Sequence, residues 1–161
     1  MSDTSRLIAL CDAVAAALNA AQPEPPAESP FVLAFEAARK VIPLTNLDKL
    51  GSDVVVEIIP TGLIETREPA GNLAGLFAGQ YELDVAIQQR LPASDSDGND
   101  TAEDVLLLAE QIADWFRQGS LTVGSHKAVL VTVDAEAAYS VPYLMQKRTV
   151  LSVTTLGFKV L

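Results

Sequence analysis

Apolar residues recur at helical spacing near the start of the chain. Leu7, Cys11, Val14 and Leu18 lie at i, i+4, i+7 and i+11, which is one face of an amphipathic helix. Ser2 or Asp3 is a suitable N-cap for it. The pattern predicts a helix over residues 4–21, with Cys11 as a small buried hydrophobe rather than a nucleophile, which would need a cationic or helix N-terminal setting.

A secretory signal is the alternative for this segment. Residues 7–21 are apolar enough, but Asp12 interrupts the apolar run and Asp3 balances the charge of Arg6. A signal peptide begins with net positive charge. The helix is therefore favoured.

Proline marks the next segment. Residues 22–30 contain four prolines, which lack amide donors and bias their predecessors to extended geometry, so we expect a stiff connector. Phe31, Leu33 and Phe35 then alternate with smaller or polar residues, and this alternation predicts a strand over residues 31–42. Helix over residues 34–41 is the alternative.

Three segments in the middle of the chain are typical of strands. The β-branched run at residues 53–60, ending at Pro60, suits a central strand. Residues 63–68 and 80–91 alternate apolar and polar positions and predict the two arms of an antiparallel hairpin. Residues 69–80 form an extended hairpin loop containing Leu73, Leu76 and Phe77, which either fold back on the core or meet a partner.

Acidic residues precede the second predicted helix. Residues 95–100 resemble the start of a calcium loop, but the sixth position is Asp100 rather than glycine and the twelfth is Leu106 rather than glutamate. We therefore expect a solvated loop ending in a capping box, with Asp100 as N-cap and Glu103 at N3.

A helix follows over residues 101–118. Its apolar stripe, expected to face the sheet, is Val105, Leu108, Ala109, Ile112, Trp115 and Phe116.

The last third of the chain returns to alternating patterns. They predict strands at residues 126–134 and 147–161, joined by a loop at 135–143 that Pro142 closes. His126 begins the first of these strands without a nearby carboxylate or cysteine partner, so a role as catalytic base is disfavoured.

Composition narrows the function. A chain of 161 residues with 49% hydrophobic content suits one domain, 1–161. A formal net charge of −10 argues against binding nucleic acid or a membrane surface. One cysteine and one histidine leave no basis for a disulfide or a Cys/His metal site, and no nucleophile elbow, phosphate loop or dinucleotide fingerprint occurs. We therefore expect no enzyme activity, cofactor or metal.

The order of the elements predicts an α+β fold. Amphipathic helices must cover a sheet, and the hairpin requires antiparallel pairing. We expect a two-layer sandwich, with a mainly antiparallel sheet and two helices packed on one face.

The element order and the hydrophobic pattern also carry a resemblance. A strand ending at Pro43, a Leu-rich turn, Val-Val-Val-Glu-Ile-Ile-Pro, the arm Tyr-Glu-Leu-Asp-Val-Ala-Ile-Gln-Gln-Arg-Leu and an acidic loop before Ala-Glu-Asp-Val-Leu-Leu-Leu-Ala-Glu-Gln-Ile-Ala-Asp-Trp-Phe follow one another. Over residues 31–161 this resembles the head–tail junction proteins of long-tailed bacteriophages, and in particular the tail terminators.

The resemblance implies a virion protein at the tail–neck junction. Such a subunit would form a ring, typically a hexamer, on the tail-tube protein and meet a neck or head-completion protein, while DNA passes through without specific binding. We assign subunit or partner contacts to Leu73, Leu76, Phe77, Tyr139 and Tyr143. The acidic charge fits a channel that does not retain DNA, or simply solubility.

Two alternatives remain. The chain could be another junction subunit, from the neck or the head-completion complex. It could also be a small metal-assisted hydrolase that uses the carboxylates of residues 95–100.

Overall fold

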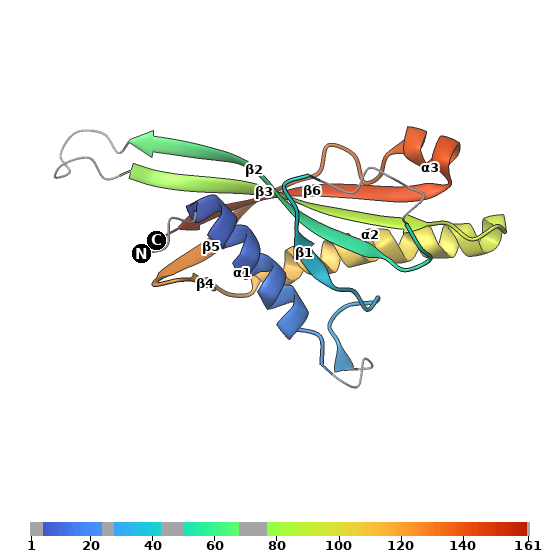
Figure 1. The fold of residues 1–161 in the computed structure, drawn as a ribbon, viewed down its shortest axis with the longest axis horizontal. Helices are drawn as coiled ribbons and strands as arrows, with labels where there is room; N and C mark the ends of the chain where they lie inside the picture. The colour runs from blue at the N-terminus through green and yellow to red at the C-terminus, as the bar shows by residue number, and fades with distance from the viewer. Residues whose placement is uncertain (1–4, 24–27, 43–49, 68–76, 161) are drawn as a thin grey trace.

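In the part of the chain that the structure describes, one curled six-stranded sheet and three helices make up a mixed α+β fold (Figure 1). The computed structural model describes residues 5–23, 28–42, 50–67 and 77–160. The strand order is β1-β2-β3-β6-β5-β4. Strand β1 runs parallel to β2, and every other neighbouring pair is antiparallel.

The longest strands are β2 (Val55–Arg67) and β3 (Phe77–Arg90), which pair along their whole length. The β-branched run and the alternating segment after it predicted two separate strands, at residues 53–60 and 63–68. That division is wrong, because the strand continues past Pro60. The register shifts between Pro60 and Gly62, and a β-bulge at this point allows the strand to include a proline.

Strand β1 (Ala37–Arg39) lies inside the strand predicted over residues 31–42 but is much shorter, and the alternative helix over 34–41 is wrong. Side-chain amides explain the short strand. Gln22 donates to Phe35 O (2.8 Å) and accepts from Phe35 N (3.0 Å), and Asn19 makes the same pair of bonds with Ala37 (2.9 and 2.8 Å). Phe31 is buried, and its ring lies 5.2 Å from that of Phe35.

Helix α1 (Arg6–Ala20) confirms the helix predicted over residues 4–21. Its buried face contains Leu10, Cys11, Val14, Ala15 and Leu18. The amides of Asn19 and Gln22, at its C-terminal end, bind the backbone next to β1. Helix α1 therefore both covers the sheet and holds its first strand.

Helix α2 (Asp95–Arg117) begins six residues earlier than predicted. The solvated loop at residues 95–100 and the capping box at Asp100 are wrong. Ser94 is the N-cap instead, and its hydroxyl accepts a hydrogen bond from the backbone of Asp97 (3.1 Å). Asp95 and Asp97 lie in the first turn, where negative charge is stabilised by the helix dipole.

The phase of α2 differs from the prediction at one residue. Val105, Leu108, Ile112 and Phe116 are buried as expected. Trp115 is not a sheet-facing residue: its side chain is 37% exposed and contacts Phe31 edge-on, with ring centroids 6.2 Å apart. Phe116 occupies the inward position and contacts Phe158 of the sheet.

The region after α2 contains two elements that the pattern did not reveal. Strand β4 (Leu121–Val123) pairs with β5 (His126–Asp134) through a tight turn in which Gly124 has φ +61. Helix α3 (Val141–Lys147) replaces the second half of the loop predicted at 135–143. Pro142 stands in its first turn, where the missing amide costs no hydrogen bond.

Strand β6 (Thr149–Val160) completes the sheet between β3 and β5. Its length and that of β5 match the predictions for residues 147–161 and 126–134 within two residues. Side chains of α1, α2 and the sheet share one hydrophobic core, whereas α3 has no buried residue. Among the described helices, none is long and apolar enough to cross a membrane.

Candidate functional site

Two grooves flank the first half of β6, where β5 no longer pairs with it. β5 is in register with residues 155–160 of β6 and then departs. The connection over residues 135–140 follows the exposed edge of β6 instead, and the backbone amide of Ser140 donates to Leu151 O (3.0 Å). This connection separates the two grooves, because its residues line both of them.

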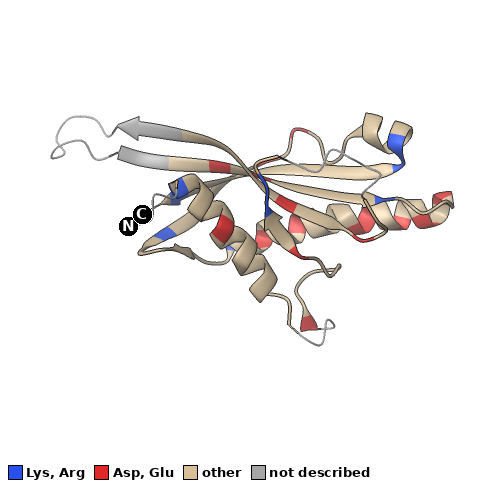
Figure 2. Ribbon diagram, in the orientation of Figure 1, with Lys and Arg blue, Asp and Glu red and all other residues tan. Residues whose placement is uncertain are grey.

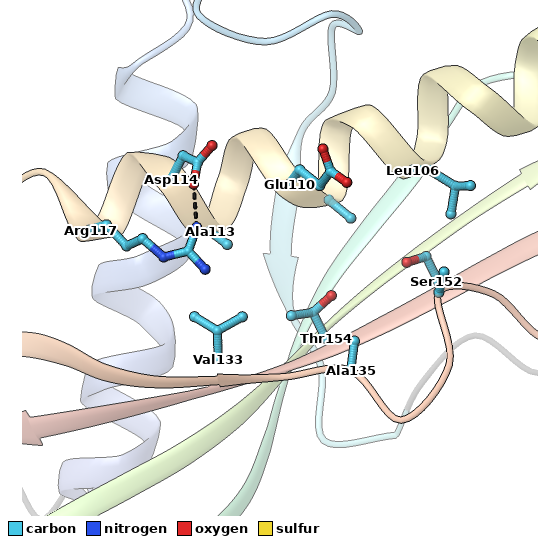
Figure 3. Close-up of a pocket in the computed structure, with 11 residues that line it drawn as sticks. Leu106, Glu110, Ala113, Asp114, Arg117, Val133, Ala135, Ser152 and Thr154 are labelled. Carbon is cyan, nitrogen blue, oxygen red and sulfur yellow. Dashed lines mark hydrogen bonds and ion pairs between the residues drawn. The ribbon is translucent and has the colours of Figure 1, made fainter.

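The first groove lies between α2 and the strands β5 and β6, and we call it the α2 groove (Figure 3). It has a volume of about 390 Å³. Its apolar lining consists of small and branched side chains, and its polar lining comes from α2 and β6. The lining residues are Leu106, Ala109, Glu110, Ala113, Asp114, Arg117, Val133, Ala135, Ala138, Ser152 and Thr154.

Two hydroxyl groups form the floor of the α2 groove. Ser152 is 3% exposed and Thr154 is 8% exposed, and both line the groove from β6. Neither hydroxyl has a hydrogen-bond partner in the described parts of the chain. Both hydroxyl oxygens are reached by solvent, so they open into the groove and are available to a group that enters it.

The helical wall of the groove carries negative charge. Asp114 forms an ion pair with Arg117, drawn as a dashed line in Figure 3. Glu110 is exposed and has no ion pair with any described residue. Together with the hydroxyl floor, this wall suits a side chain that has an aliphatic stem and a cationic hydrogen-bond donor at its end.

The second groove lies on the other side of the connection and contains Tyr139, so we call it the Tyr139 groove. Its volume is about 630 Å³. Three carboxylates line it, from Asp84, Asp134 and Glu136. The carboxylate of Asp84 already accepts a hydrogen bond from the Thr155 hydroxyl (2.6 Å).

The structure does not bring the five predicted contact residues together. Leu73 and Leu76 lie outside the described residues. Phe77 is the first residue of β3, whereas Tyr143 lies in α3, next to the opposite end of β3, where Arg90 pairs with Thr149. A strand of 14 residues spans roughly 45 Å, so these positions belong to different ends of the sheet.

Tyr139 and Tyr143 both flank β6. Tyr139 is half-buried against the core and lines the Tyr139 groove. Tyr143 is half-buried too, and its backbone amide donates to the Ser140 hydroxyl that caps α3. Their assignment as contact residues stays a prediction.

The thiol of Cys11 is fully buried in α1. Burial is the main cause that raises the pKa of this thiol to about 12; the carboxylate of Asp12 contributes in the same direction and Arg39 in the opposite one. A thiol with this pKa is protonated at neutral pH and is a poor nucleophile. The structure therefore gives Cys11 the environment of a packing residue.

The acidic residues 95–100 form the first turns of α2 rather than a loop. Within the described ranges, no group of three His, Cys, Asp or Glu side chains is placed to hold a metal ion. His126 is exposed at the start of β5, opposite Val123.

Basic residues lie at both ends of the sheet in Figure 2, and one of these is the end where the chain termini lie. Val129 of β5 is the register partner of Lys159 in β6, and Lys127 lies two residues before Val129 on the same face of β5. All three side chains are exposed, and we call them the basic patch. Because the intervening Ala128 is fully buried in the core, the basic patch faces the side of the sheet opposite to α2.

Sequence reasoning missed the α2 groove. The alternation along β6 placed Ser152 and Thr154 among inward-facing positions, and a hydroxyl pair within an otherwise apolar face was the available signal. No protein-family model matches the chain, and no curated protein matches its sequence.

Proposed function

We propose that the protein is a structural virion subunit that caps a bacteriophage tail tube as a ring and provides the joining surface to the neck or head. The proposal rests first on the resemblance in element order and hydrophobic pattern to the tail terminators. Its partners would be further copies of itself, the tail-tube protein and a neck or head-completion protein. Assembly would take place in the host cytoplasm and end in the virion.

The observation that carries the proposal is the pair of open sheet edges. β1 pairs only with residues 56–58 of β2, so in the described chain no strand lies beside β2 from Ile59 to Arg67. β4 pairs only with residues 126–128 of β5, which leaves Val129 to Asp134 open in the same way. Open edges of this length favour association between protein chains.

The hairpin of β2 and β3 adds a second supporting feature. The pairing of β3 with β6 ends at Gln80 and Lys159, whereas β3 begins at Phe77 and β2 continues to Arg67. The arms therefore reach past the end of β6, as Figure 1 shows. A projecting hairpin is a suitable element for contact with a neighbouring subunit or with the tube.

We also propose that the functional unit is the two-layer sandwich expected from the sequence, with α1 and α2 as its helical layer. Side chains of α1 and α2 belong to the same hydrophobic core, and this supports the arrangement. Helix α3, which buries no residue, would then be an appendage available for contact.

The test uses tail tubes assembled from the tube protein of the same phage. We expect the purified protein to bind the tube end as a ring, visible by electron microscopy, with a mass corresponding to six copies. Capped tubes should stop growing when more tube protein is added. Absence of binding to tube ends, or a ring whose symmetry cannot match that of the tube, would contradict the proposal.

The same assay distinguishes the alternative junction role. A neck or head-completion subunit would leave tube ends free and bind to purified DNA-filled heads instead. In either position DNA passes through the ring, and the net charge of −10 would limit its adhesion.

A further inference from the structure

We infer that the ring is held together head to tail, with the basic patch of one copy docked on the outer face of α2 and the α2 groove of the next copy. This inference rests on the proposed ring and specifies its interface. The occupant of the groove is thus a second copy of this chain, and the groove receives a lysine side chain.

The receiving surface is a stripe along α2. Glu103, Leu107, Glu110 and Asp114 lie at i, i+4, i+7 and i+11, all are exposed, and we call them the acidic stripe. The stripe borders the α2 groove, since Glu110 and Asp114 line it. Neither Glu103 nor Glu110 has an ion pair with another described residue.

The basic patch matches this stripe in charge and in apolar content. Lys127 and Lys159 are exposed and form no ion pair with described residues, and Val129 lies between them as an exposed apolar side chain. On the stripe, Leu107 is the corresponding exposed apolar side chain between two carboxylates. Complementary potentials of this kind set the partner and the register of an interface.

The groove itself provides the second, independent observation. Its floor is formed by Ser152 and Thr154, which are more than nine-tenths buried as residues; their hydroxyl oxygens open into the groove and lack partners among the described residues. A lysine ammonium carries three donors. One donor reaches Glu110 at the wall and the others reach the hydroxyls, while the methylene stem covers Ala113 and Val133.

The positions of the two surfaces make the contact heterologous. The acidic stripe belongs to the helix that packs on the core side of the sheet, and the basic patch faces the opposite side. In a two-fold dimer, each copy would have to turn both its acidic stripe and its basic patch toward the same partner. The two surfaces point in opposite directions, so a two-fold dimer cannot bury both. Repetition of the contact therefore leads from copy to copy, and it gives the proposed ring when the rotation between neighbouring copies closes.

The experiment compares two charge-reversed variants. The acid-reversed variant carries Glu103→Lys and Glu110→Lys, and the base-reversed variant carries Lys127→Glu and Lys159→Glu. We expect each to keep the wild-type melting temperature within a few degrees, because all four residues are exposed. Each variant should lose ring formation on tail tubes and at high concentration, as measured by native mass spectrometry.

An equimolar mixture of the two variants is the decisive sample. Each contact in the mixture again joins opposite charges, provided that the two variants alternate. We expect the mixture to recover rings with 1:1 stoichiometry and an even number of copies. Controls with reversals elsewhere, Lys40→Glu and Glu28→Lys with Glu36→Lys, should assemble as the wild type does.

A separate variant tests the floor of the groove. Thr154→Val with Ser152→Ala removes both hydroxyls at nearly constant shape. We expect the monomer to stay folded and the dissociation constant between copies to rise by about fivefold or more. An unchanged dissociation constant would overturn the role of the groove.

The outcomes separate this inference from the proposed function. Rings that form normally in both charge-reversed variants would overturn the head-to-tail interface and leave the tail-capping proposal standing. A wild-type protein that forms no ring, with or without tubes, would overturn both. A mixture that fails to recover rings, although both variants are folded, would also overturn the interface.

Discussion

Gly157 in β6 is a residue whose small size the sheet requires. The side chains of Gln80 and Thr132 meet above it in a hydrogen bond of 3.1 Å. A methyl group at Gly157 would overlap Thr132 Oγ1 and lie 2.6 Å from Gln80 Nε2. The absence of a side chain here therefore allows β3 and β5 to be bridged across β6.

We expect Gly157→Ala to lower the free energy of unfolding by about 1–3 kcal/mol, because the new methyl group must displace both side chains. Chemical denaturation measures the effect. Thr132→Ala in the same chain should recover part of the loss, since it removes the closest atom. Gly119→Ala is the control, because no atom lies within 4 Å of its added methyl group, and it should be nearly neutral.

The raised pKa of Cys11 leads to a prediction on alkaline stability. A thiol whose pKa is about 12 in the fold and near 9.0 when exposed binds its proton more tightly in the folded state. Its contribution is fully present below pH 9.0 and is lost as the pH rises toward 12. We expect the stability of the wild type to fall more steeply over this range than that of Cys11→Ala, as measured by urea unfolding at several pH values.

At the scale of the element, the burial of Phe116 and the exposure of Trp115 show which face of α2 packs on the sheet. Phe116 is 5% exposed and lies edge-on to Phe158, whereas Trp115 is 37% exposed. We expect Phe116→Ala to cost about 3–5 kcal/mol and Trp115→Ala only about 1–2 kcal/mol, because less of the Trp115 side chain leaves water on folding. Equal losses for both variants in thermal unfolding would contradict this phase.

The short strand β1 depends on α1. Asn19 satisfies both backbone groups of the buried Ala37, and removing its amide leaves a donor and an acceptor buried without partners. We expect Asn19→Ala to destabilise the protein by about 2 kcal/mol or more. Hydrogen exchange should show faster exchange of the Ala37 amide. Asn19→Asp, which keeps the acceptor and nearly the same shape, should retain the protection of that amide.

Periodicity predicted those elements whose burial pattern is strong and local. Helix α1 and the strands β5 and β6 follow directly from it. The short length of strand β1 could not be predicted, because side-chain amides at and just after the end of α1 bind the backbone of residues 35–37. The pattern predicts the start of α2 six residues too late, because it favours Asp100 as the N-cap, whereas Ser94 is the residue that caps the helix. The α2 groove was missed because it needs three elements to meet.

At the scale of the whole molecule, charge has two opposite effects. The formal net charge of −10 makes the folded monomer repel itself, while the inferred interface joins opposite charges. Added salt screens both interactions. We expect sodium chloride to raise the melting temperature of the monomer and to weaken the ring, and a sedimentation series over salt concentration measures both. A ring that tightens with salt would contradict an electrostatic interface.

The place of β6 in the sheet has a consequence for synthesis on the ribosome. β6 follows every other strand in the chain, yet it pairs with both β3 and β5 and joins the two halves of the sheet. Until it leaves the exit tunnel, the β2–β3 hairpin and the β4–β5 hairpin each present a long edge with no strand to close it. The nascent chain is therefore most prone to aggregation before β6 has joined the sheet, and crowding of polysomes at that stage would reduce the yield of native protein.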